Sequence, residues 1–522
     1  MPQKICMALA AVLLVVAAAT VVGQSYDLTP KEQLGKALFF DKISSPKSVS
    51  CADCHGPGTG FTGPIPGINR AGAVYRGAVP QRFGNRKPPA ASYATFSPVF
   101  HFDSIEGLFL GGNFWDGRAT GERLGNPAAD QALGPFLNPV EQNNASELAV
   151  LEIVAASKYA GLWEEVWGEP LELDNYSDVS KNYDRIGLAI AAYEASPEVN
   201  QFSSKFDIFW YNAADAGMDV SAITVANWED YTGLGLSDRE TEGLAFFTDE
   251  TKGKCALCHV LDPVTGIDGV EHPPVFTDFS FDNLGVPKNP DNPFYRMDEV
   301  YLDDGSPINP MGDAWIDLGL GGFLESRPDY QAMAAENYGK HKVPTLRNVD
   351  KRPGMMFPKA YMHNGVFKSL EDVVHFYNTR DVEDWPPPEV ADNVNHDELG
   401  DLGLTRAEEA LIVAFMRTLS DGYRPKAEPM EEMAAKTVSV DLVGTNPAGP
   451  SSALTFSLPE AGQVKLDVFD VSGRKVATLL DGWQDAGVRT IDLGTAGLSS
   501  GVYFVHVQNR EAASTKKIVL LK

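Results

Sequence analysis

The feature that most constrains this chain is a five-residue motif that occurs twice, as Cys51-Ala52-Asp53-Cys54-His55 and as Cys255-Ala256-Leu257-Cys258-His259. In the spacing C-x-x-C-H, two thiols can add to the two vinyl groups of one haem while the adjacent histidine ligates the iron. A single copy leaves a disulfide, a zinc site or a redox pair open. Two copies, which use every cysteine except Cys6, predict two covalently bound haem c groups with His55 and His259 as iron ligands.

The two motifs lie in similar surroundings. LGKALFF at 34–40 precedes the first motif and GLAFF at 243–247 precedes the second, and a Phe-Thr pair follows each. Such self-similarity indicates an internal duplication. We therefore expect a mainly helical fold of two duplicated cytochrome c-like haem domains with long loops, at residues 25–230 and 231–420.

The two ends of the chain differ from this body. Residues 1–24 combine Lys4 with an uncharged apolar run and small residues, which predicts a signal peptide and an exported protein. No later stretch is long and apolar enough for a transmembrane span. Residues 421–436 are polar and predict a linker. Residues 437–522 alternate apolar and polar side chains between turn signals, which predicts a C-terminal all-β sandwich.

The formal charge of −28 excludes nucleic acid as a partner, because phosphates would be repelled. It is compatible with a cationic electron donor such as a small basic cytochrome c. A solvated acidic surface that only serves solubility remains the alternative.

Further motifs carry a resemblance to a known family. The first half contains FWDGRA at 114–119, Gln131, GP at 134–135 and NPVE at 138–141. The second contains VPTLRNV at 343–349 and YMHNG at 361–365. In this order, and up to about residue 420, they resemble the bacterial di-haem cytochrome c peroxidases and the related MauG enzymes. The resemblance implies that the first haem binds peroxide and that electrons enter at the second.

The resemblance also implies roles for three residues. Trp115 would lie between the haems and assist electron transfer, while Gln131 and Glu141 would line the peroxide pocket. Glu141 would be the acid–base group, because splitting peroxide requires moving a proton from one oxygen to the other. The alternatives are a core tryptophan and a helix-capping or solvated carboxylate.

Two positions depart from the pattern of other members. A histidine that blocks the first haem at rest is replaced by Ala71, so this haem is expected to be open without reductive activation. We expect a structural or surface role for His101, the next histidine. Tyr377 replaces a methionine as the implied sixth ligand of the second haem, as in MauG-type enzymes. It shares an apolar face with its neighbours on a helix that Ser369 can cap, so a core tyrosine is the alternative.

The resemblance implies calcium between the haem domains, and the relevant segments are altered here. Lys87 stands where an asparagine ligand is expected, and an ammonium group cannot ligate calcium. The second segment reads Pro358-Lys359-Ala360. Either Asn85 compensates or Lys87 replaces the cation, so calcium is open but disfavoured.

The tail resembles a type IX secretion sorting domain, through residue pairs such as Asn446-Pro447, the segment VFDVSGR at 468–474 and the basic end KKIVLLK at 516–522. This implies a location in the periplasm, at the cell surface or outside the cell. A permanent module for adhesion or partner binding is the alternative.

Three functions follow as expectations. The leading one is reduction of hydrogen peroxide to water with electrons relayed from the second haem to the first. The others are MauG-like oxidation of a protein substrate and a pure di-haem electron-transfer cytochrome, in which both irons would carry six ligands. A homodimer is left open.

Overall fold

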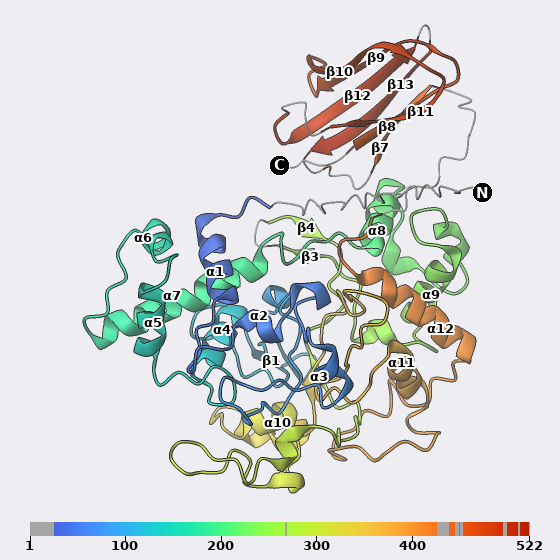
Figure 1. Ribbon diagram of the computed structural model, residues 1–522. Coiled ribbons are helices and arrows are strands. Elements are labelled where there is room, and N and C mark those ends of the chain that lie inside the picture. The colour runs from blue at the N-terminus through green and yellow to red at the C-terminus, as the bar shows by residue number, and fades with distance from the viewer. Residues whose placement is uncertain are drawn as a thin grey trace, which may run out of the picture.

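The computed structural model describes residues 26–266, 269–424, 438–443, 448, 453–493, 498–509 and 512–520 (Figure 1). The expected signal peptide and residues 425–436 of the expected linker lie outside these ranges. Within them, none of the helices has the length and apolar character needed to cross a bilayer.

The first helical core lies beside the first motif and is formed by four helices, which are α1 (Pro30–Phe40), α4 (Pro127–Leu137), α5 (Glu147–Ala155) and α7 (Tyr176–Ala195). Thr29 and Glu32 form a capping box that starts α1. Helices α1 and α7 touch closely at Gly35, where an added Cβ would lie 1.9 Å from the Ala189 carbonyl oxygen. The glycine therefore sets how closely the two helices pack.

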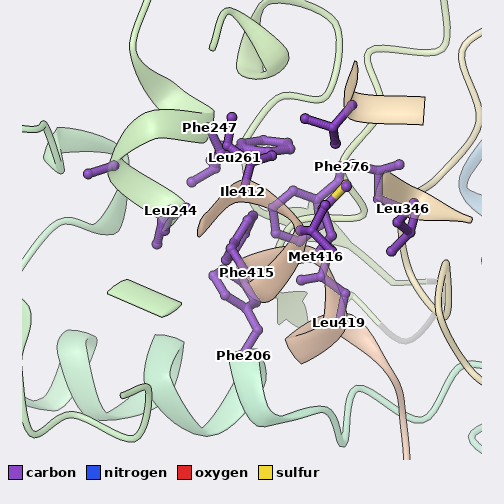
Figure 2. Close-up of a cluster of buried hydrophobic side chains, with 14 of the residues drawn as sticks. Phe206, Leu244, Phe247, Leu261, Phe276, Leu346, Ile412, Phe415, Met416 and Leu419 are labelled. Carbon is purple, nitrogen blue, oxygen red and sulfur yellow. The ribbon is translucent and has the colours of Figure 1, made fainter. Parts of the chain in front are cut away.

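The second core repeats this arrangement with α8 (Lys205–Asp215), α9 (Asp238–Thr248), α11 (Leu370–Thr379) and α12 (Arg406–Met416). Figure 2 shows side chains of α8, α9 and α12 converging in it. At Gly243 an added Cβ would lie 2.1 Å from the Leu411 carbonyl oxygen, so α9 approaches α12 as α1 approaches α7.

Most of the remaining body consists of long segments with short helices and strands of two or three residues. Buried polar groups hold these segments in place. Arg347 and Asp207 form a fully buried ion pair at 2.6 Å. The carboxylate of Asp421 accepts hydrogen bonds from the Tyr93 hydroxyl and the Asn348 amide, so the end of the body is tied to both halves.

The C-terminal region consists of two antiparallel sheets, with strand orders β10-β9-β12-β13 and β11-β8-β7. Their bounds are β7 Ser439–Val443, β8 Ala453–Leu458, β9 Gly462–Asp470, β10 Lys475–Gln484, β11 Gly487–Asp492, β12 Gly501–Asn509 and β13 Ala512–Leu520. Alternate residues of both sheets share one apolar core, as the period-two pattern predicts. This core contains no residue of the helical body.

Candidate functional site

Two cavities lie in the body, one beside each C-x-x-C-H motif. Cys51, Cys54 and His55 line the first. Cys255, Cys258 and His259 line the second. The cysteines are free thiols in the structure rather than disulfides. Each cavity therefore presents two thiols and one imidazole on its wall.

The two histidines are oriented in the same way. Nδ1 of His55 lies 3.0 Å from the Phe61 carbonyl oxygen, and Nδ1 of His259 lies 2.8 Å from that of Phe276. Both phenylalanines have a left-handed backbone, with φ of 55° and 56°. With Nδ1 held by a carbonyl, Nε2 is the nitrogen left to bind a metal. The donor set of each cavity thus fits a covalently attached haem.

A smaller cavity lies between the two, and Trp115 lines all three. The indole nitrogen of Trp115 donates to the Lys87 carbonyl oxygen at 2.8 Å. The sequence-predicted tryptophan is thus a buried residue that the cavities beside both motifs share.

The segments around Trp115 and His363 cross between the halves. The Lys342 amide donates to the Trp115 carbonyl oxygen, and the Lys87 amide donates to that of His363, both at 2.8 Å. The residues before Trp115 and His363, Phe114 and Met362, both have positive φ. Turns from the two halves, each with a left-handed residue, therefore meet here, with a tryptophan on one side and a histidine on the other.

Gln131 and Glu141 both line the first cavity, together with Phe114, Arg118 and Pro135. The Asn138 amide donates to Oε1 of Glu141 at 2.8 Å. Burial raises the pKa of Glu141, while Arg118 and the Asn138 bond oppose the rise. The structure thus places a partly buried glutamate, with one carboxyl oxygen held by Asn138, in the cavity that also contains His55.

Tyr377 lies on α11 and lines the second cavity together with Leu370, Val373 and Val374. Ser369 caps this helix, as the sequence predicts. Burial raises the pKa of Tyr377 above the usual value of a phenol. A phenolate there therefore requires a cation such as ferric iron. Met362 lines the same cavity.

Ala71 and His101 lie away from the cavities. Ala71 ends α3 (Pro66–Arg70) and is exposed. His101 is exposed on β1 (His101–Asp103), where Nδ1 contacts the Val99 carbonyl oxygen. Neither residue is part of the lining of the first cavity.

Sequence reasoning missed several residues of these walls. Glu194 on α7 lines the first and the smaller cavity, and burial raises its pKa to about 8. Lys342, His341 and Glu389 line the second cavity. For His341 and Lys342, the available signal was their position directly before the segment VPT at 343–345. Nothing in the sequence pattern indicated that these side chains are buried.

The second of the two altered calcium segments, residues 358–360, contains Lys359. The ammonium group of Lys359 donates to the carbonyl oxygens of Thr59 and Asn348, each at 3.0 Å, and of Lys351 at 3.1 Å. Burial lowers the pKa of Lys359, and nearby Lys87 lowers it further. Carbonyls from both halves thus converge on one nitrogen.

Comparison with known proteins agrees with these sites. The sequence model of the family described as di-haem cytochrome c peroxidase matches residues 29–215. The methylamine utilization protein MauG of Paracoccus denitrificans (strain Pd 1222) is 32% identical over 412 residues, which are 76% of this chain and 90% of that protein.

The chain belongs to the di-haem cytochrome c peroxidase and MauG family. Another relative in it, the cytochrome c551 peroxidase of Pseudomonas aeruginosa, is 30% identical over 233 residues, covering 44% of this chain and 50% of that protein. The crystal structure of the diheme peroxidase BthA from Burkholderia thailandensis E264 superposes with a TM-score of 0.56 and 28% identity, covering 76% and 88% of the two chains. The fold of the body is thus that of a di-haem peroxidase, and membership of this family implies two haem c groups.

The tail is assigned in the same way. The model described as secretion system C-terminal sorting domain matches residues 446–521. The predicted type IX sorting domain is therefore confirmed, and it indicates export to the cell surface or beyond.

Proposed function

We propose that this protein is a peroxidase that reduces hydrogen peroxide to water, with electrons that enter at the second haem and pass by Trp115 to the first. The observation that carries the proposal is the lining of the first cavity, where Gln131 and Glu141 face the same space as His55. Trp115 lines this cavity and the second one.

Each haem would be held by the two cysteines and the histidine of its motif. When bound, it supplies an iron that can coordinate peroxide and exchange electrons. The protein fixes the orientation of both imidazoles through the Phe61 and Phe276 carbonyls. In the second cavity, Tyr377 would be a further residue that holds the iron, whereas the first cavity contains the glutamine and the glutamate.

Glu141 has the properties of an acid–base group. Peroxide, two electrons and two protons give two waters, so protons must be moved within the cavity. Asn138 holds one carboxylate oxygen of Glu141. The other can accept a proton from the near oxygen of peroxide and return it to the departing one. Gln131 provides an amide that can orient the substrate.

The central test is the Glu141→Gln variant, which keeps the shape and removes the acid–base function. Because proton transfer by a positioned side chain contributes roughly 10²–10⁴-fold, we expect peroxide turnover to fall by about that factor, with unchanged haem absorbance. Glu152→Gln, an exposed position on α5, is the matched control. Full turnover in the Glu141 variant would refute the assignment.

A paramagnetic-resonance spectrum of the ferric protein separates an enzyme from an electron carrier. A peroxidase with an open first haem gives a high-spin signal. Two low-spin haems without reaction with peroxide would show that the protein is a carrier. Trp115→Phe should slow turnover at least tenfold while both haem signals remain.

Tyr377 and Ala71 favour a second candidate, MauG-like oxidation of a protein substrate. Phenolate ligation stabilises ferric and higher-valent iron relative to ferrous iron, which suits storage of oxidising equivalents. Assays with peroxide and either a small cytochrome c or exported proteins as electron donors decide between the two activities.

We further propose that the halves arose by duplication. The closely packed glycine in each helix pair, the left-handed phenylalanines and the crossed amide bonds support this. Because Phe206 and Phe209 of α8 pack in the second core, we place the boundary between the haem domains before α8 rather than at residue 230. We also propose that the ammonium group of Lys359 takes the place of calcium.

A further inference from the structure

Two buried imidazoles stack on each other in the wall of the second cavity. The ring centroids of His341 and His363 lie 3.6 Å apart and their planes differ by 8°. The Trp115 ring lies 6.5 Å from that of His363. Among the described residues, Nε2 of each histidine is buried without a hydrogen-bond partner. The peroxide chemistry proposed for the first cavity uses neither ring.

Carboxylates face both nitrogens. Nε2 of His341 lies 3.4 Å from Oδ2 of Asp317, and Nε2 of His363 lies 3.8 Å from Oε2 of Glu389. Arg86 donates to both oxygens of Asp317, at 2.7 and 2.6 Å, and so offsets its charge. The other titratable or charged groups nearby are Tyr295, which donates to Glu389, Asp116, which pairs with Arg86, and the adjacent Lys342.

The geometry suits protons better than a metal ion. Donor atoms of Asp317, His341 and His363 lie within 4.8 Å of one another, as a metal site would require. However, the lone pair of an imidazole lies in the plane of its ring, and two stacked parallel rings cannot direct theirs at one ion. Arg86 also occupies both oxygens of Asp317.

We propose that His341 and His363 form a proton site that binds one proton as one electron enters the second haem, and so links electron entry to pH. The electron comes from the donor protein and reduces the iron, while the proton comes from solvent and binds an imidazole nitrogen. Two imidazolium ions in this stack would repel each other, so the pair takes one proton rather than two. The inference rests on the second haem of the proposed function.

The charge of the histidine pair before the haem is reduced supports this order of events. Burial, together with nearby His341, lowers the pKa of His363 to about 4. His363 is therefore neutral before the electron arrives and can accept a proton afterwards. An added electron makes the cavity more negative, which favours the protonated form. Glu389, whose Oε2 lacks a hydrogen-bond partner, can stabilise the resulting cation.

The test is a spectroelectrochemical titration of the second haem in the complete holoprotein between pH 5 and 8. One proton per electron lowers the midpoint potential by about 59 mV per pH unit, because a tenfold change in a one-electron equilibrium corresponds to that value. A potential that does not depend on pH in the natural protein overturns the proposal without any variant.

Three variants identify the proton carrier. His363→Phe removes the imidazole that takes the proton and should reduce the slope by at least half, whereas His101→Gln, at an exposed position, should leave it intact. Lys342→Met is the discriminating variant, because Lys342 lines the same cavity and burial lowers its pKa to about 7, within the titrated range. Its ammonium group donates to Ser97 and Gly112 rather than to the histidine pair, so we expect the slope to remain in this variant. A slope lost in the lysine variant and kept in His363→Phe would overturn the proposal, and so would a slope abolished by a chelator.

This readout is separate from enzyme activity. Haem content and midpoint potential are measured spectroscopically, whereas peroxide turnover is measured by assay. A retained slope with no turnover would refute only the peroxidase, and turnover with no slope would refute only the proton site.

Discussion

Glu194 is a carboxyl whose charge state is set by burial alone. It lies on α7 with 3% of its surface exposed, and burial raises its pKa to about 8. An unfolded chain has a glutamate pKa near ~4.3. Between these values the folded protein holds a proton that the unfolded chain releases. The free energy of unfolding therefore decreases as pH rises through this window. Below the window both states hold the proton, so none of this stability is lost.

Glu194→Gln should remove this dependence. A neutral amide of the same shape needs no proton, so the variant should be more stable than the natural protein at pH 8 and similar to it near pH 4. The gain is on the order of a few kcal/mol, at about 1.36 kcal/mol for each unit of pKa. Thermal unfolding of the holoprotein at several pH values measures it. Parallel pH profiles of the two proteins would contradict this account.

At the scale of elements, a local pattern predicted the helix that carries Tyr377. Ser369 caps α11, as expected, and Tyr377 faces the second cavity. The proton site had no such signal. Asp317, His363 and Glu389 come from irregular segments and His341 from the short strand β6 (His341–Lys342), and only tertiary packing brings the four together. Hydrophobic periodicity cannot predict contacts between segments whose sequences have no periodic pattern.

Gly243→Ala tests the close packing of α9 on α12. A Cβ at this position would overlap the Leu411 carbonyl, which is backbone and cannot rotate away. Overpacking of this kind costs roughly 1–3 kcal/mol, so the melting temperature should fall by several degrees. Gly161→Ala at the start of α6 (Gly161–Trp167) is the control, because nothing lies within 4 Å of its added Cβ.

Lys359→Met tests the contact that joins the two halves. The variant removes the ammonium donor from three carbonyls, of which that of Asn348 keeps the Lys351 amide, and each carbonyl left unsatisfied costs about 1–3 kcal/mol. We expect a lower melting temperature, and no change in the natural protein when calcium is chelated. The exposed Lys158→Met is the control. A natural protein that loses stability on chelation would show that a metal contributes after all.

On the scale of the whole molecule, the tail and the body have separate cores. Removal of residues 437–522 should therefore leave both haem spectra and peroxide turnover unchanged. The same deletion should abolish transport across the outer membrane, because it removes the sorting domain. Fractionation of cells that express the full-length and shortened proteins measures this. Loss of haem in the shortened protein would show that the tail supports the body.

The crossed amide bonds at Trp115 and His363 allow the two halves to specialise. In a symmetric pair of identical subunits, every position at the contact is the same residue twice, and a change made for one purpose is imposed on both sides. A single chain has no such restriction. With the roles proposed above, an indole that carries electrons faces an imidazole that carries protons, and the two rings are 6.5 Å apart. Covalent linkage of the halves thus gives one interface two kinds of carrier.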